Sequence, residues 1–432
     1  MPILPSRLPG SPDPQRWLWG AFLLLYPAAT LVVRGGASAL LLAASLVAVY
    51  SLIVSRSLPA PVQDASARLA VGFCFAMAAP LCAVALSELW HRQLTLGAFD
   101  SPARFLAAAP LFLALRKAPA ATLRWADLSF GVGAMAALGI SVFAPRDWGD
   151  GRLGSTFLNP IHFGAIALVL GVLSALSLNW WGKDPLGVRL FKLAGLAAGL
   201  LSSLQTGARG GWLAIPVIVV VLAFVPRERK GRGWRKVLPF AALAIALAGY
   251  LASHTVRERI HMIWSDLSQF EQGHKDTSIG IRLQIYQAVL SLIPRDPVFG
   301  LGADGLAASL QSLVDTGGMT PIAAQFGRGE THNQMLAYVG SFGIIGGLAL
   351  AALYLMPAAL FWNFRAAPAR CAARAALMGV VFVVAFVTFG LTVETFNLKM
   401  TASFYATVIA VLAAIASHNA PPVASAAGRS LQ

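Results

Sequence analysis

Residues 37–54 read ASALLLAASLVAVYSLIV and contain no charged side chain. A transmembrane helix needs about 20 consecutive, mainly apolar residues, so this stretch predicts one. Similar stretches recur along most of the chain, and we predict membrane-spanning helices at 17–33, 37–54, 68–86, 103–115, 125–143, 160–178, 191–205, 211–225, 237–252, 333–362, 372–391 and 399–417. Two of them, 103–115 and 191–205, are short, so we expect them either to extend into their flanks or to be buried among their neighbours.

The composition of the chain excludes a soluble multidomain protein. Hydrophobic residues make up 57% of the 432 residues and charged residues only 12%. An average soluble chain has about 25% charged residues, so these charges could not cover the surface of a soluble protein of this size. The sequence therefore predicts an all-α integral membrane protein with about twelve transmembrane helices. Three cysteines are too few for a framework of disulfides.

The net charge of +15 indicates topology, because the cytoplasmic loops of membrane proteins carry an excess of Lys and Arg. With the N-terminus in the cytoplasm, 20 of the 33 basic residues lie on the inner side. Six of the other 13 lie in one long outer loop, which the rule discounts, so the short-loop comparison is 20 against 7. We therefore expect a multi-pass protein with both termini in the cytoplasm. The basic run 227–236 is either a topology anchor, which the bias of the other inner loops favours, or a patch for anionic lipids or nucleic acid.

This topology divides the chain into four regions. They are the first nine transmembrane helices at 1–252, an outer loop at 253–332, three more helices at 333–417, and a cytoplasmic tail at 418–432. Apolar residues between 256 and 270 recur at helical spacing against charged ones, as in an amphipathic helix that lies at the membrane interface. We expect further loop helices at 281–293 and around 305–315. Loops of this length are usually functional.

Basic residues at the outer ends of the spans are candidates for chemistry. Arg209 lies in the outer turn Thr206-Gly207-Ala208-Arg209-Gly210, where glycines let the backbone approach a ligand closely. An outward Arg between two spans runs against the charge rule, and its planar donor fork suits phosphate. The alternative is an Arg that extends to lipid headgroups. Arg282 begins the second loop helix and by itself would be an ordinary surface charge.

Polar residues where the outer loop returns to the membrane form a second group of candidates. His332 lies in Glu330-Thr331-His332-Asn333-Gln334, and a neutral imidazole there could accept a proton. A lone His is more often structural. The glycines that follow, Gly340, Gly343, Gly346 and Gly347, have a spacing that permits close helix packing. Glu394 is the acid of the last outer loop, and Asn333, His162 and Arg152 are further candidates.

These features resemble the O-antigen ligase family, integral membrane enzymes that complete lipopolysaccharide. The resemblance covers the topology: about twelve spans, cytoplasmic termini, and a large periplasmic loop between the ninth and tenth. The matching motifs are Thr206-Gly207-Ala208-Arg209-Gly210, the stretch from Gly280-Ile281-Arg282 through Pro297 to Gly300-Leu301-Gly302, and Thr331-His332-Asn333 before a Gly-rich helix. No single motif is specific, but their order and common outward side are.

The resemblance implies an architecture like that of the lipid-linked-sugar (GT-C) glycosyltransferases, in the bacterial inner membrane, with the active site facing the periplasm. It implies transfer of O-antigen from undecaprenyl diphosphate to a sugar hydroxyl of lipid A–core, by an inverting reaction without a metal or other cofactor. Arg209 and Arg282 would stabilise the charge of the diphosphate leaving group. His332 would be the general base, and the role of Glu394 stays open. The expected partners are the lipid-linked donor, the lipid A–core acceptor and membrane lipids, and not nucleic acid.

Other functions remain to be weighed. The same family contains O-antigen polymerases and protein O-oligosaccharyltransferases, which use the same class of donor. A secondary transporter with twelve spans predicts internal repeats, short outer loops and ionisable residues within the spans, whereas the two halves of this chain differ. A lipid flippase would line its midplane with basic residues, whereas the arginines here lie at the outer edge.

Overall fold

The computed structural model describes residues 14–54, 65–149, 151–224 and 254–418, which are almost all helical. Within these ranges, eight helical segments are long and apolar enough to cross a membrane, and three further apolar helices are shorter. The helices of this bundle are α1 (Pro14–Val32), α2 (Gly36–Val54), α3 (Ala65–Trp90), α4 (Asp100–Arg116), α6 (Ala126–Phe143), α7 (Pro160–Leu176), α8 (Leu186–Gln205), α10 (Ala214–Phe224), α16 (Gln334–Phe364), α17 (Arg370–Gly390) and α18 (Lys399–Ala416).

Each of these helices coincides with a predicted membrane span. The two spans that seemed short extend into their flanks, because α4 begins at Asp100 and α8 begins at Leu186. The span predicted at 237–252 and the basic run at 227–236 lie outside the described residues, so the number twelve stays a prediction.

Short elements connect the helices of the bundle. The segment between α6 and α7 forms a small antiparallel hairpin, in which Arg146 pairs with Gly154 and Asp147 with Leu153. These short elements are η1 (Leu96–Phe99), α5 (Ala120–Leu123), β1 (Arg146–Asp147), β2 (Leu153–Gly154) and α9 (Arg209–Trp212). None of them was predicted.

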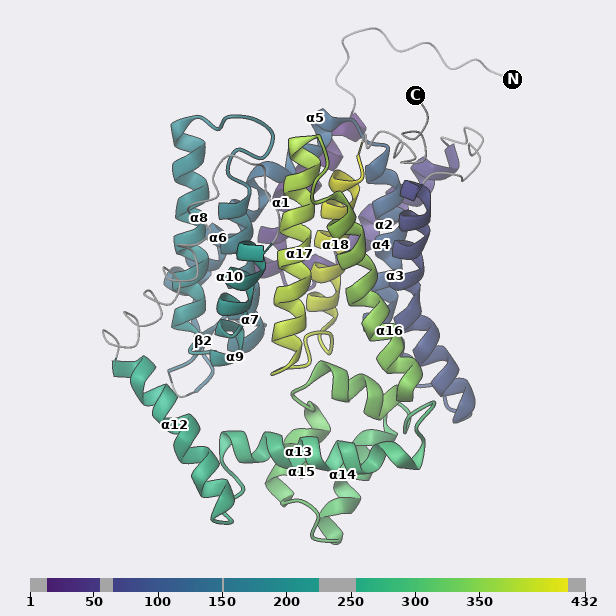
Figure 1. The fold of residues 1–432 in the computed structure, drawn as a ribbon, viewed down its shortest axis with the longest axis vertical. Coiled ribbons are helices and arrows are strands. Elements are labelled where there is room, and N and C mark those ends of the chain that lie inside the picture. Colours follow the sequence, from purple (N-terminus) through teal and green to yellow (C-terminus); the bar gives the residue numbers. More distant parts are fainter. Residues whose placement is uncertain (1–13, 55–64, 150, 225–253, 419–432) are drawn as a thin grey trace, which may run out of the picture.

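The long loop is itself a helical layer. Its elements are α12 (His254–Glu271), α13 (Ser278–Leu292), η2 (Ile293–Arg295), α14 (Gly305–Asp315) and α15 (Pro321–Gly329). Figure 1 shows α13, α14 and α15 lying across one end of the bundle, which we call the loop end. The three loop helices expected from the sequence are present, and α15 was missed. Its start carries a recognisable signal, because Thr320 accepts a hydrogen bond from the backbone N–H of Ala323 and Pro321 follows it.

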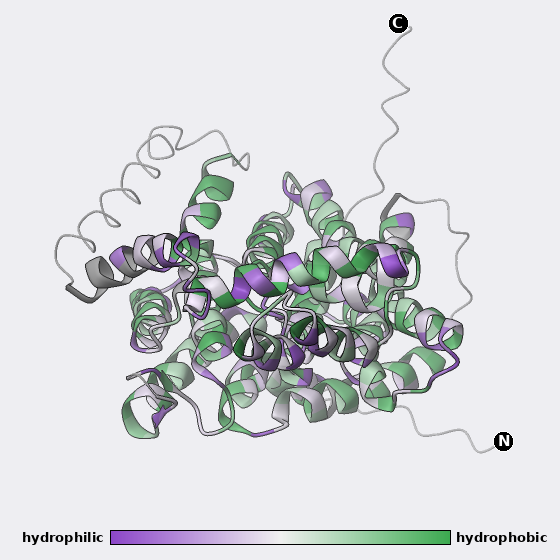
Figure 2. Ribbon diagram, turned by 90° about the horizontal axis from the view of Figure 1, so that it is seen from below, coloured by the Kyte–Doolittle hydropathy of each residue, from purple (hydrophilic) through white to green (hydrophobic). Residues whose placement is uncertain are grey.

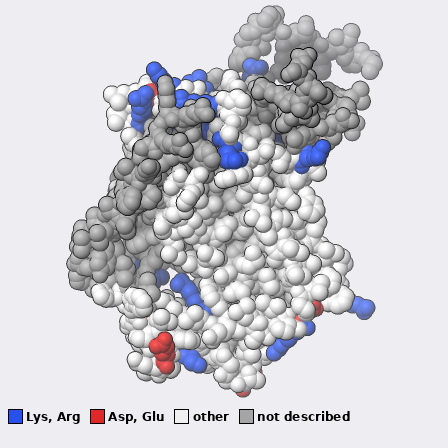
Figure 3. Space-filling view, viewed as in Figure 1, with Lys and Arg blue, Asp and Glu red and all other residues white. Residues whose placement is uncertain are grey.

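The outside of the bundle matches an apolar environment. Figure 2 shows hydrophobic residues over most of the helices. On the face drawn in Figure 3, a broad belt across the middle of the molecule has no Lys, Arg, Asp or Glu side chains among the residues shown. Basic side chains lie toward the two ends of the molecule. The helices α17 and α18 lie inside the bundle. In their most apolar 18-residue stretches, 78% and 89% of the residues are buried, against 28% in α2. The chain is therefore a multi-pass membrane protein in which the central helices α17 and α18 are covered by the other helices.

A buried lysine joins α8 to α6 and to the connection between α7 and α8. Lys192 of α8 is fully buried, and its Nζ lies 2.8 Å from Asp127 Oδ1 of α6 and 3.1 Å from Asp184 Oδ2. It also donates to the carbonyl of Ser177 at 2.9 Å. A buried ammonium must be paired in this way. Lys192 is one of the 20 basic residues predicted on the inner side, and it is thus also part of the internal packing.

The Gly-rich helix α16 is broken at Gly343, which has φ +64° and ψ −159°. The chain at 297–302 inserts its backbone there. Leu301 N donates to the carbonyl of Gly340 at 3.0 Å, and Ile344 N donates to the carbonyl of Pro297 at 2.9 Å. The glycines of α16 were expected to allow close helix packing. At Gly343 the helix packs against the 297–302 segment instead. A break in a membrane helix leaves backbone groups without partners, and the hydrogen bonds to this segment satisfy them.

Candidate active site

The segment 330–333 places His332 at the loop end, directly before α16. His332 has φ +56°, a left-handed conformation that is uncommon outside glycine. Its carbonyl accepts a hydrogen bond from Tyr286 Oη of α13 at 2.9 Å. The next residue, Asn333, begins α16 by accepting the backbone N–H groups of Met335 and Leu336. The backbone on both sides of His332 is therefore held in place.

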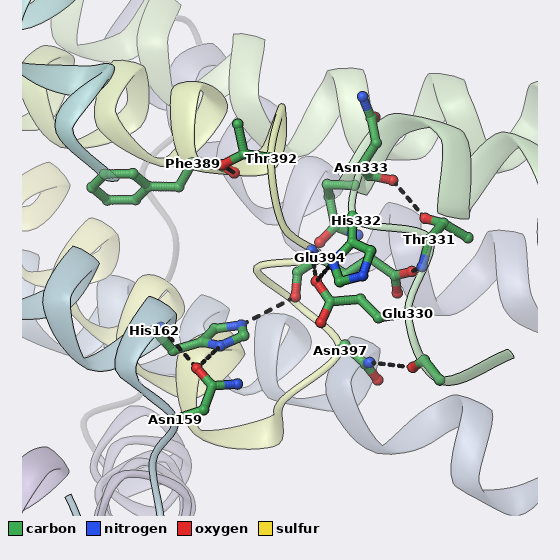
Figure 4. A network of polar contacts seen from close by, with 12 residues as sticks. Asn159, His162, Glu330, Thr331, His332, Asn333, Phe389, Thr392, Glu394 and Asn397 are labelled. Carbon is green, nitrogen blue, oxygen red and sulfur yellow. Dashed lines mark hydrogen bonds and ion pairs between the residues drawn. The ribbon is translucent and has the colours of Figure 1, made fainter. Parts of the chain in front are cut away.

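Two glutamates surround His332. His332 Nδ1 lies 3.4 Å from Glu330 Oε1, and both side chains are mostly buried. Glu330 Oε1 also accepts the backbone N–H of Glu394 at 2.8 Å. In return, Glu394 Oε1 accepts the backbone N–H of Thr331. Figure 4 shows the three side chains close together, between the end of the long loop and the connection from α17 to α18.

The two carboxyl groups differ in their ionisation. Burial raises the pKa of Glu394 to about 7, against the lowering effect of the hydrogen bonds from Thr331. Burial also acts to raise the pKa of Glu330, but His332 and the backbone N–H of Glu394 outweigh it and hold this pKa below its ordinary value. At neutral pH, Glu330 is therefore the ionised partner of the imidazole and Glu394 is only partly ionised.

His162 approaches the same place from the start of α7. Its Nε2 lies 3.3 Å from the carbonyl oxygen of Glu394, and its Nδ1 lies 2.9 Å from Asn159 Oδ1. Asn159 also caps α7 by accepting the backbone N–H of His162 at 3.0 Å. His162 is only 3% exposed. Both of its ring nitrogens are occupied, so it positions the Glu394 segment and leaves no free nitrogen for a substrate (Figure 4).

Arg282 stands one turn before Tyr286 on α13, and residues four apart lie on the same helix face. Tyr286 Oη contacts the carbonyls of His332 and, at 3.2 Å, Leu391. Burial raises the pKa of Tyr286, although the charge of Arg282 acts to lower it, so the phenol keeps its proton and donates. Among the described residues, no carboxylate forms an ion pair with Arg282. A half-buried arginine without such a partner is suited to bind an anion.

The turn that carries Arg209 packs against two parts of the site. Gly210 contacts Thr392, two residues before Glu394, so closely that a β-carbon at Gly210 would overlap the Thr392 side chain. Gly207 has φ +61°, and the side chain of Arg152 passes beside it. The Nε of Arg152 is buried and has no hydrogen-bond partner among the described residues. This turn thus brings Arg152 and the backbone of Arg209 to the segment that holds Glu394.

The geometry extends the set of residues predicted from sequence. His332, Glu394 and His162 gather around the 391–397 connection, and Arg152 and the Arg209 turn adjoin it. Arg282 lies beside Tyr286, whose hydroxyl contacts this connection at Leu391. Glu330 and Tyr286 were not singled out from the sequence. Glu330 could have been recognised as an acid two residues before a candidate base, whereas nothing local marks Tyr286. Among the described residues, no group of three or more His, Cys, Asp or Glu side chains is arranged to hold a metal ion.

Comparisons with known proteins cover part of the segments that carry these residues. An uncharacterized protein of Haemophilus influenzae is 29% identical over 204 residues, which are 46% of this chain and 50% of that protein. The chain thus spans about half the length of the curated relative it matches. Residues 193–351, which contain Arg209, Arg282 and His332, match the family model described as O-antigen ligase. This match confirms the resemblance to the O-antigen ligase family that the sequence motifs indicate.

Proposed function

We propose that this protein is an O-antigen ligase of the bacterial inner membrane. It transfers preassembled O-antigen from undecaprenyl diphosphate to a sugar hydroxyl of lipid A–core. The observation that carries the proposal is that His332 and the Arg209 turn lie against the Glu394 segment, with Arg282 beside Tyr286, at one end of an apolar bundle. A lipid-linked donor requires this combination, because its lipid stays in the membrane while its diphosphate and sugars lie at the surface.

In this proposal the arginines stabilise the diphosphate leaving group. As the bond between sugar and diphosphate breaks, negative charge develops on the phosphate oxygens, and cationic donors already in place stabilise it. Arg282 has no carboxylate partner among the described residues, so its guanidinium is free to take up this charge. Arg209 lies in a turn at the same site. Two arginines in this role make a metal ion unnecessary for the departure of the diphosphate.

In this proposal His332 activates the nucleophile, which is the sugar hydroxyl of the acceptor. A sugar hydroxyl is too weakly acidic to ionise at neutral pH, so a base must accept its proton during attack. The hydroxyl oxygen forms a bond to the anomeric carbon from the face opposite the diphosphate, the bond to the diphosphate breaks, and the configuration inverts. His332 takes the proton, and undecaprenyl diphosphate leaves. Glu394 is the next candidate for the base, because burial raises its pKa to about 7, near neutral pH.

The membrane placement follows from the charges. The excess of basic residues in the short loops of one side supports an orientation with both termini in the cytoplasm and the loop end in the periplasm. Trp264 of α12 is 69% exposed, and an exposed tryptophan on an amphipathic helix is typical of a membrane interface. We therefore place α12 at the outer surface of the membrane, with the site facing the periplasm. The described 254–332 segment then forms the periplasmic loop.

Reconstitution tests the proposal directly. Purified protein is mixed with undecaprenyl-diphosphate-linked O-antigen and lipid A–core, with and without thorough chelation of metal ions. We expect long-chain lipopolysaccharide to form at the same rate in both cases. A strict metal requirement would contradict the mechanism. No transfer to lipid A–core, together with chain extension of the lipid-linked sugar, would identify a polymerase, and transfer to a protein would identify an O-oligosaccharyltransferase.

The cellular counterpart is the glycolipid profile of a deletion strain. Loss of long-chain lipopolysaccharide with accumulation of lipid-linked polymer indicates a ligase. A single repeat attached to the core indicates a polymerase. Failure of the lipid-linked donor to reach the periplasm would instead support the flippase alternative.

A further inference from the structure

We propose that Glu330 is the positioning residue for His332. Its carboxylate holds the Nδ1–H of the imidazole, so that the opposite nitrogen, Nε2, carries the lone pair that accepts the proton. It then stabilises the imidazolium that forms. This inference rests on the proposed function, because it assumes that His332 is the base.

The contacts of Glu330 suit this role. Oε1 lies 3.4 Å from His332 Nδ1 and accepts the backbone N–H of Glu394 at 2.8 Å. The second contact ties the carboxylate to the bundle, so its position does not depend on the long loop alone. The Glu330 side chain is 19% exposed, and among the described residues no Lys or Arg forms an ion pair with it. The imidazole is therefore the group that this carboxylate faces, and the contact becomes an ion pair when His332 takes up a proton.

The backbone of His332 is fixed independently of Glu330. Tyr286 holds its carbonyl, and Asn333 caps the helix that follows. These contacts set the direction in which the side chain leaves the backbone, but not the orientation of the ring. Nδ1 is buried and makes no hydrogen bond among the described residues, but the Glu330 carboxylate lies 3.4 Å from it, so a small rotation of the ring would let Nδ1–H donate to this carboxylate. A base whose other nitrogen is held by a third group is the recurring arrangement of activated side chains in enzymes.

Other groups lie near the imidazole besides Glu330. Glu394 faces it from the 391–397 connection, Tyr286 of α13 holds the carbonyl of His332, and Arg282 lies beside Tyr286. His162 of α7 reaches the same cluster through the carbonyl of Glu394. The carboxylate of Glu330 differs from these groups, because it lies 3.4 Å from Nδ1, the one ion-pair distance found for His332 among the described residues, and is ionised at neutral pH. Removal of its charge should make the imidazolium harder to form.

The test compares Glu330→Gln and Glu330→Asp with Glu271→Gln, a control at an exposed carboxylate at the end of α12. For each purified protein, kcat and the KM for donor are measured across pH, and thermal unfolding confirms folding. We expect Glu330→Gln to lower kcat within the ~10²–10⁴ that general-base assistance is worth, with an unchanged donor KM. The acidic limb of its kcat profile should move to lower pH. Glu330→Asp, which keeps the charge, should recover part of the rate, and Glu271→Gln should match the wild type.

The outcomes separate this inference from the proposed function. Wild-type kcat and pH profile in Glu330→Gln would overturn the role of Glu330. A loss of kcat with an unchanged profile and no recovery by Asp would also overturn it, because that result describes a structural contact. If a folded His332 variant that binds donor keeps wild-type turnover, the assignment of the base fails, whatever Glu330 does. If that variant is inactive and Glu330→Gln is normal, only the inference about Glu330 fails.

Discussion

Glu330 and Glu394 each hold the segment that carries the other. Glu330 Oε1 accepts the backbone N–H of Glu394 at 2.8 Å, and Glu394 Oε1 accepts the backbone N–H of Thr331, next to Glu330. This reciprocal pair fastens the end of the long loop to the connection between α17 and α18. His332 lies within the fastened segment. The bundle, and not only the loop, therefore locates the proposed base.

The pair also predicts how stability depends on pH. The pKa of Glu394 is raised by burial from 4.5 to about 7, so folding favours its neutral form. The corresponding stabilisation is fully present below pH 4.5 and is lost as the pH rises through about 7. Glu394→Gln keeps an oxygen acceptor for Thr331 but does not ionise. Its melting temperature minus that of the wild type should become more positive between about pH 5 and about pH 8, as measured by thermal unfolding in detergent. A constant difference across this range would contradict the raised pKa.

A substitution at His332 tests the base. Because His332 has φ +56°, Ala adds backbone strain, whereas Asn tolerates this conformation. We expect His332→Asn to lower turnover by ~10²–10⁴ while the protein stays folded and binds undecaprenyl-diphosphate donor, and His332→Ala to be equally inactive. Donor binding and turnover are measured on the same purified protein. His274→Ala, an exposed histidine of the same loop, is the control. Turnover of His332→Asn within a few-fold of the wild type would make Glu394 the next candidate.

A substitution at Arg282 tests the diphosphate site. Arg282→Ala should greatly reduce transfer, because the leaving group loses a cationic donor. Arg282→Lys should recover little, since Lys lacks the planar donor fork that binds phosphate through two bonds. The matched control is Arg295→Ala, an exposed arginine of the same loop. The same pair of substitutions at Arg209 should behave alike. Wild-type rates in both Lys variants would mean that these residues contribute only a general electrostatic attraction to the diphosphate.

Substitutions at two glycines test whether the insertion of 297–302 at the break in α16 stabilises the fold. Gly300 and Gly317 both have positive φ, so Ala at either position adds strain of roughly 1–2 kcal/mol. A β-carbon at Gly300 would also overlap the backbone of Phe342 and Gly343, whereas nothing lies within 4 Å of one at Gly317. Gly300→Ala should therefore lower the melting temperature and the yield of folded protein much more than Gly317→Ala. Equal effects would mean that the insertion of 297–302 into α16 contributes little to stability.

Cysteine labelling tests the orientation. In a variant whose three native cysteines are replaced by Ala, new cysteines are placed one at a time at Gln272, Asp315 and Lys183, which are all exposed. A membrane-impermeant thiol reagent added to intact cells with a permeabilised outer membrane should label the first two and not the third. The opposite pattern would reverse the orientation and place the site in the cytoplasm.

The local sequence was enough to predict the membrane helices and most of the loop. Insertion of a helix depends on the transfer free energy of its own residues, so the apolar stretches mark α2 or α17 without reference to any neighbour. The outward polar residues could be selected in the same way, because the charge of the short loops sets the side on which they lie. Arg209, Arg282, His332 and Glu394 were therefore recognisable as candidates. Their grouping was expected from the family resemblance alone.

The contacts between these candidates depend on packing across long stretches of chain. Nothing near Tyr286 indicates that its hydroxyl reaches the carbonyl of His332, and nothing near Lys192 indicates that it is buried against Asp127. Glycine spacing in α16 predicted close packing, but only the approach of 297–302 shows that Gly343 breaks the helix. The ionisation of Glu330 and Glu394 differs for the same reason. A pKa depends on burial and on the nearest charges, and both arise only when segments distant in sequence come together.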